Sequence, residues 1–180
     1  MNYYGAKELA ESARTVRKNT VAIARDIPEE KYSFRPAAET RSVAELFAHI
    51  ALSPSFLHQV HGEERRTTLA GFDFPAYLQR MIAEEKARRT KDQVIELLST
   101  RGEKWANWVQ GLDDSFLAEV VAMPPGSTPP ARTRFDMILS AKEHEMHHRG
   151  QLMLIERLLG IVPHLTRRMQ ERAAASAAKK

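Results

Sequence analysis

Apolar side chains recur every third or fourth residue along most of this chain, which is the spacing of an amphipathic helix. The first such stretch carries Leu9, Val16, Ile23 and Ile27 at this spacing, with charged residues between them. Polar segments or prolines separate it from later stretches of the same kind. We predict helices over residues 4–27, 43–57, 75–89, 91–111 and 134–159, where 75–89 and 91–111 are either two helices or one bent helix.

Local signals mark several of the helix boundaries. Pro28 ends the first helix, because the residue before a proline is steered out of the helical region. Pro54 must end or bend the second helix, since it cannot donate a hydrogen bond to the carbonyl of Ile50. A bend there would open space beside His49. Capping boxes, in which a hydroxyl and a longer polar side chain satisfy the first free amides, are formed by Ser42 with Glu45 and by Thr90 with Gln93.

Two segments lack helical periodicity. Residues 63–74 are polar and contain glycine, and residues 113–132 contain four prolines, so we expect loops or a flap there. No run of alternating β-branched residues indicates a strand. The sequence therefore predicts an all-α protein, an up-and-down four-helix bundle with extra short helices and a proline-rich loop before the last long helix. We expect the bundle to span residues 1–165 and a basic, alanine-rich tail to span 166–180.

Composition narrows the chemistry. The 180 residues include no cysteine, which excludes disulfides, thiolate nucleophiles and iron–sulfur clusters, so any metal must be held by nitrogen and oxygen. We expect a cytoplasmic protein without a membrane partner, since no signal peptide or long apolar span is visible. The net charge of +4 raises nucleic acid as a partner. Basic and acidic residues are interspersed, however, so we rank nucleic-acid binding last.

The strongest candidate for a functional site lies in the last predicted helix. His144 and His148 are one turn apart and about 40° apart around the axis, so both rings leave the same face. Met137 and Ile155 fall between them, which places both histidines on the buried stripe. His147 falls at the edge of the stripe or beyond it. An i, i+4 pair of imidazoles can bind one divalent metal, although this pattern also arises by chance on ordinary helices.

A third ligand is predicted on the second helix. His49 lies among apolar residues there, whereas His58 and His61 read as surface histidines. Three imidazoles would leave a coordination position for water or substrate, which is typical of catalytic rather than structural sites. Zinc or nickel suits three nitrogens best, and iron also fits.

The polar residues next to these histidines can be explained without a role in metal binding. Glu145 and Arg149 are four residues apart and could form an exposed ion pair. Gln151 could reach the site as an outer partner of a ligand or as a substrate contact, but an amide at the edge of the bundle is an equally good reading. His147 is the residue most easily mistaken for a ligand, because a different rotation of the helix would exchange its role with that of His144.

Three segments resemble the DinB superfamily of damage-inducible, YfiT-like four-helix bundles. They are residues 27–36, 42–50 and 144–152, which are similar to the first connection, the second helix and the last-helix motif of that family. The resemblance implies the metal ligands His49, His144 and His148, an open zinc or nickel site, and a homodimer. It also implies a reaction on a small-molecule substrate with a low-molecular-weight thiol, such as bacillithiol or mycothiol, as a cofactor.

Two classes of function follow. In the first, a metal held by the three histidines activates a thiol or water, which makes the protein an S-transferase or a hydrolase. The alternative is a non-catalytic, stress-associated dimer whose metal site is structural or vestigial. Trp105 and Trp108 could supply its apolar interface, although aromatic residues at this spacing are more often core.

Overall fold

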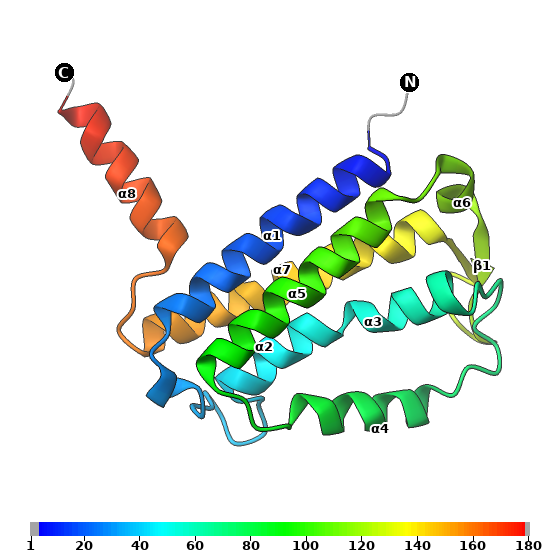
Figure 1. Ribbon diagram of the computed structural model, residues 1–180, viewed down its shortest axis with the longest axis horizontal. Helices are drawn as coiled ribbons and strands as arrows, with labels where there is room; N and C mark the ends of the chain where they lie inside the picture. Colours follow the sequence, from blue (N-terminus) through cyan, green and yellow to red (C-terminus); the bar gives the residue numbers. More distant parts are fainter. Residues whose placement is uncertain (1–3, 179–180) are drawn as a thin grey trace.

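The computed structural model describes residues 4–178, and its long helices pack side by side as a four-helix bundle (Figure 1). This confirms the predicted fold class, and 75–89 and 91–111 prove to be two separate helices. Short elements close the two ends of the bundle. The elements are α1 (Ala6–Asp26), η1 (Glu29–Lys31), α2 (Val43–Leu52), α3 (Pro54–Leu57), η2 (His58–Glu63), α4 (Phe74–Glu85), α5 (Lys91–Gln110), α6 (Asp114–Ala118), β1 (Val120–Ala122), β2 (Ala131–Thr133), α7 (Arg134–Leu158) and α8 (His164–Ala177).

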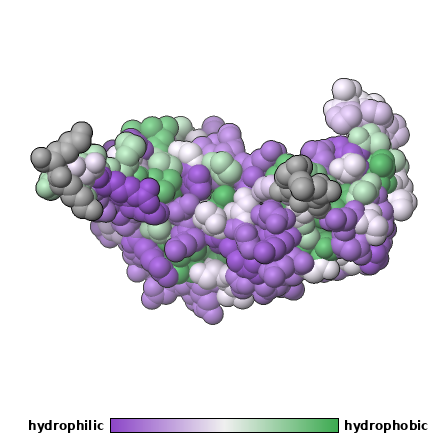
Figure 2. Space-filling view, turned by 90° about the horizontal axis from the view of Figure 1, so that it is seen from above, coloured by the Kyte–Doolittle hydropathy of each residue, from purple (hydrophilic) through white to green (hydrophobic). Residues whose placement is uncertain are grey.

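The bundle is formed by α1, by α5, by α7 and by the continuous segment from α2 through α3 to η2. Both predicted capping boxes are present, at the start of α2 and of α5. The helix α4 lies outside the bundle, along α2 (Figure 1). Figure 2 looks down on the bundle and shows a largely hydrophilic face with apolar patches near both ends. None of the described helices combines the length and apolar character that crossing a bilayer requires.

The second helix bends at Pro54, as its sequence predicts. A break at Ser53 separates α2 from α3, and η2 continues the same segment as a π-helix. Pro54 leaves the carbonyl of Ile50 without its helical donor. A terminal nitrogen of Arg17, on α1, donates to this carbonyl at 3.2 Å. The bend is therefore stabilised by a side chain from a neighbouring helix.

A polar layer separates two apolar clusters in the core. One cluster is built around Trp105, Val109 and Met137, and the other around Phe47 and Leu152. In the layer between the two clusters, Glu145 of α7 accepts two hydrogen bonds from Arg17, at 2.9 and 3.0 Å, and one from Thr20 at 2.7 Å. Both charged side chains are less than a tenth exposed. The expectation of an exposed pair between Glu145 and Arg149 was therefore wrong.

Gly102 on α5 makes room for this buried arginine. A Cβ atom at Gly102 would lie 2.6 Å from Cγ and 2.8 Å from Nη1 of Arg17, whose hydrogen bonds hold it in place. We expect Gly102→Ala to lower the free energy of unfolding by about 1–3 kcal/mol through overpacking. Gly150→Ala on α7 is the matched control. Its Cβ meets nothing within 4 Å, so it should stabilise by about 0.5–1 kcal/mol. Urea denaturation measures both variants. A Gly102→Ala variant that is as stable as Gly150→Ala would contradict this packing.

The segment 113–132 contains more structure than its prolines suggest. Asp113 caps the short helix α6 by accepting from the amide of Phe116, and the strands β1 and β2 form an antiparallel ladder in which Val121 pairs with Arg132. The expectation that this segment is a loop or a flap, without a helix or strands, was wrong in this respect. Strands of three residues are too short for an alternating pattern to be recognised in the sequence.

His61 is buried, contrary to its expected place on the surface. Its side chain is fully shielded from solvent, and its Nδ1 lies 2.8 Å from a terminal nitrogen of Arg134. Burial, followed by the charge of Arg134, lowers the pKa of His61 to about 4, so the ring is neutral near pH 7. His58 stays partly exposed beside Trp108. Neither histidine lies in the cluster formed by the other candidates.

The C-terminal helix α8 projects from the end of the bundle (Figure 1). It begins at His164, so the predicted start of a tail at residue 166 falls inside its first turn. Two contacts hold this turn to α1: His164 Nε2 lies 3.2 Å from Asn19 Oδ1, and Arg167 pairs with Asp26 at 2.7 Å. The division into a bundle and a tail stays a prediction.

Candidate metal centre

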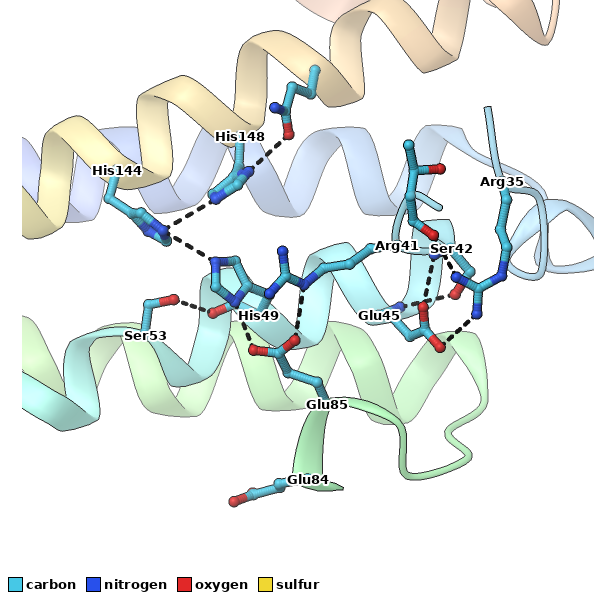
Figure 3. A network of polar contacts seen from close by, with 12 residues as sticks. Arg35, Arg41, Ser42, Glu45, His49, Ser53, Glu84, Glu85, His144 and His148 are labelled. Carbon is cyan, nitrogen blue, oxygen red and sulfur yellow. Dashed lines mark hydrogen bonds and ion pairs between the residues drawn. The ribbon is translucent and has the colours of Figure 1, made fainter. Parts of the chain in front are cut away.

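Three histidine rings meet between α2 and α7 (Figure 3). The Nε2 atom of His144 lies 3.1 Å from Nε2 of His49 and 3.1 Å from Nε2 of His148. One nitrogen from each ring lies within 4.8 Å of the other two. These are the three residues that the sequence analysis selects as candidate ligands, and Met137 and Ile155 are buried on the same face of α7, as expected.

The outer nitrogens of two rings have acceptors that fix their protons. Nδ1 of His49 lies 2.6 Å from Oε1 of Glu85, and Nδ1 of His148 lies 2.8 Å from Oε1 of Gln151. Because both partners are acceptors, each Nδ1 carries a hydrogen, and the Nε2 of a neutral ring then presents a lone pair. Hydrogen bonds of this kind orient metal-binding histidines and increase their basicity.

The inner nitrogens form a donor set that a cation fits. The lone pairs of His49 and His148 both face Nε2 of His144, which can carry only one proton. At least one close pair of nitrogens therefore lacks a hydrogen between them. A tetrahedral zinc ion with bonds of about 2.0–2.1 Å needs its nitrogen ligands about 3.3 Å apart, close to the 3.1 Å found for two of the three pairs.

The environment keeps two of these rings neutral. Burial, followed by the charges of His148 and His49, lowers the pKa of His144 to about 4. Burial is also the largest cause that lowers the pKa of His148. Imidazole binds metal only in its neutral form, so both rings are available as ligands at neutral pH.

Glu85 is a buried part of the site that the sequence analysis did not identify. It lies at the end of α4, about 5% exposed, and its second oxygen accepts from Nε of Arg41 at 2.8 Å. Burial raises its pKa, but the hydrogen bonds from His49 and Arg41 lower it more, and the pKa lies below its usual value. One ionised carboxylate thus holds both a ring and a guanidinium in place.

We expect Glu85→Ala to reduce zinc affinity about 10- to 100-fold, which is typical for loss of an outer partner of a metal-binding histidine. Glu85→Gln should recover part of the loss, since an amide oxygen can still accept from His49. The adjacent Glu84 points away from the rings (Figure 3), so Glu84→Ala should leave the affinity unchanged. Competition with a chromophoric chelator measures all three variants. Equal affinities for the two alanine variants would contradict this role.

The other two candidates lie on the outer side of His148. Gln151 is exposed but reaches the ring of His148 with its oxygen, and its nitrogen lies 3.1 Å from Nε2 of His147. His147 is exposed and is not part of the group of three rings. The structure thus places Gln151 against a candidate ligand, and His147 beside both Gln151 and the ring of His148, with the two ring centroids 5.0 Å apart.

A cavity of about 730 Å³ adjoins the rings on the side of His148, Gln151 and Glu85. Its walls come from the segment before α2 and from α2, α4 and α7. Of the three rings, that of His148 lines this cavity, so a small molecule bound there would lie at the edge of the candidate site.

Comparison with known proteins gives a family and a fold. A family model described as the DinB superfamily matches residues 13–152. Among solved structures, a DinB-like protein of Bacillus subtilis, YjoA, is 24% identical with a TM-score of 0.61, and the match covers 85% of this chain and 92% of that one. YfiT of Bacillus subtilis, described as a probable metal-dependent hydrolase with an unusual four-helix bundle topology, is 13% identical with a TM-score of 0.67, covering 89% and 91%. No curated protein matches significantly.

Proposed function

Because this chain belongs to the DinB superfamily, whose model matches most of its length, we propose that it is a metal-dependent enzyme. A divalent ion would be held by the Nε2 atoms of His49, His144 and His148. The observation that carries this proposal is the convergence of these three atoms, with two of the rings oriented by Glu85 and Gln151. Zinc or nickel suits three imidazoles best, and iron is the next choice.

The proposed reaction is the attack of an activated water or low-molecular-weight thiol on a small electrophilic substrate. A bound divalent ion would lower the pKa of that nucleophile or polarise a substrate oxygen. Glu85 and Gln151 hold two of the rings in orientation, and the adjoining cavity takes the substrate. The description of YfiT as a probable hydrolase supports water, and the resemblance to thiol-dependent members of the family supports a thiol.

Metal analysis of protein purified without an affinity tag tests this proposal. We expect about one equivalent of zinc, nickel or iron in the wild type and none in His148→Ala. Hydrolysis of a panel of esters and amides, and conjugation of a panel of low-molecular-weight thiols, should each be lost on chelation if they depend on the ion. A folded wild type that binds no added divalent ion would overturn the proposal.

Thermal stability with and without chelator distinguishes a structural ion from a catalytic one. A structural ion predicts a large loss of thermal stability on chelation and no exchange of water or thiol at the metal.

We also propose a homodimer, as the resemblance implies. Light scattering on the eluting protein should then give twice the chain mass of 20.4 kDa, and a mass of 20.4 kDa would contradict it.

A further inference from the structure

The cavity beside the three rings has an apolar side. Ile82 on α4 and Leu154 and Leu158 on α7 line it and are 40%, 59% and 59% exposed, although they are large hydrophobic residues. Apolar side chains that stay exposed around a cavity gain from contact with an apolar ligand. This side of the cavity therefore suits the hydrocarbon part of a small molecule.

The same cavity has three cationic residues, and their partners differ. Arg35 donates to Glu45 at 2.7 Å and to the carbonyl of Thr40, so both of its terminal nitrogens are engaged within the protein. Lys86 ends α4 and is exposed. Arg41 donates to Glu85 through Nε alone. Its side chain is 39% exposed, and Figure 3 shows a terminal nitrogen directed away from Glu85.

Arg41 also lies close to the candidate metal ligands. Its ion pair with Glu85 joins it to the ring of His49, because the two oxygens of this carboxylate bind the two residues. After burial and the neighbouring histidines, the charge of Arg41 is a further cause that lowers the pKa of His144. The guanidinium is thus held in a fixed orientation, next to the rings and within the cavity wall.

We propose that the terminal nitrogens of Arg41 bind a carboxylate of the substrate, whose apolar part lies against Ile82, Leu154 and Leu158. This inference rests on the proposed function, since the bound carboxylate would hold the substrate beside the residues that would bind the metal. Two parallel N–H donors match two carboxylate oxygens. Glu85 already pairs with this guanidinium, so the site favours the ligand of smaller charge: a carboxylate carries one negative charge, whereas a phosphate monoester carries nearly two.

The two halves of this recognition make separate predictions for binding. A carboxylate bound by a guanidinium should bind about 10- to 100-fold tighter than its neutral amide analogue. Each methylene that becomes buried against the apolar side should strengthen binding about fourfold. Hexanoate should therefore bind at least tenfold tighter than acetate, and at least tenfold tighter than hexanamide.

Calorimetric titration of the zinc-loaded protein with hexanoate, acetate and hexanamide tests the inference. Arg41→Met should weaken hexanoate binding at least tenfold, and Arg41→Lys should recover part of the loss because it keeps the charge without the planar fork. Lys86→Met is the matched control, since it removes one charge from the same cavity, and should change the affinity less than twofold. Zinc content and melting temperature are measured for each variant, so that only folded protein is compared.

Three results would overturn the inference: no hexanoate binding by the wild type, equal losses in Arg41→Met and Lys86→Met, or equal binding of hexanoate and hexanamide. Failure of the proposed function would look different. The wild type would then bind no zinc, while the same titrations on the metal-free protein still compare Arg41→Met with Lys86→Met.

Discussion

Replacing His144 with alanine is expected to lower the affinity for zinc more than a hundredfold. The Nε2 atom of this residue is the one that contacts both other rings, so the variant leaves two ligands on opposite helices. Loss of an outer partner typically costs 10- to 100-fold, and loss of a ligand should cost more. Chelator competition measures the affinity directly. In a thermal melt, about 100 Kd of free zinc should stabilise the wild type by about 2.7 kcal/mol and leave the variant nearly unchanged.

His147→Ala is the control for this prediction. It removes the same side chain three residues further along α7, but its ring lies outside the group of three, where it contacts Gln151 and the edge of the His148 ring. We expect its zinc affinity to stay within a few-fold of the wild type. A larger loss in His147→Ala than in His144→Ala would show that the two residues exchange roles and that α7 is rotated from its described position.

Replacing Glu145 with alanine is expected to lower the free energy of unfolding by about 3–5 kcal/mol. The substitution leaves the guanidinium of Arg17 charged, buried and without its carboxylate, and removing one partner of a buried pair costs this much. Thr20 loses the shorter of its two hydrogen bonds and keeps the one to the carbonyl of Val16. Urea denaturation measures the change, and the same experiment shows whether the transition stays cooperative.

Glu103→Ala is the matched control for the buried pair. Glu103 on α5 also accepts from an arginine of α1, Arg14, but its side chain is 57% exposed. Exposed ion pairs contribute about 0–1 kcal/mol, so this variant should unfold almost like the wild type. Similar losses in Glu145→Ala and Glu103→Ala would mean that the polar layer does not stabilise the bundle in the way described.

The helical phase of α7 explains why the site and the buried pair lie at one level of the bundle. Successive residues turn by about 100°, so His144 and His148 face α2 while Glu145 faces α1. One turn of α7 therefore contributes both to the candidate metal centre and to the core. The carbonyl of Ile50 on α2, which lacks its helical donor, accepts a hydrogen bond from Arg17 and so joins the same layer.

Local patterns in the sequence were enough to predict the bundle and the three rings. Apolar periodicity gives the helices, the capping boxes give their starts, and a spacing of four residues places His144 and His148 on one face. His49 could be selected because a histidine among apolar residues needs a polar partner. Each of these signals is local, because it lies within a few residues of the position that it predicts.

Contacts between distant elements could not be predicted in the same way. Glu85 reads as one of several charged residues near the end of a helix, and only the packing of α4 on α2 brings it to His49. Glu145 has Arg149 as its nearest helical partner in sequence, yet pairs with Arg17 of α1. A polar residue on a helix shows its partner only once the neighbouring helices are in place.

The most direct measurement is anomalous diffraction from crystals of the untagged protein loaded with zinc. The account predicts one strong peak about 2.0–2.1 Å from the Nε2 atoms of His49, His144 and His148, with Glu85 and Gln151 on the Nδ1 atoms of His49 and His148. A zinc ion bound elsewhere, or three rings without a peak between them at saturating zinc, would contradict it.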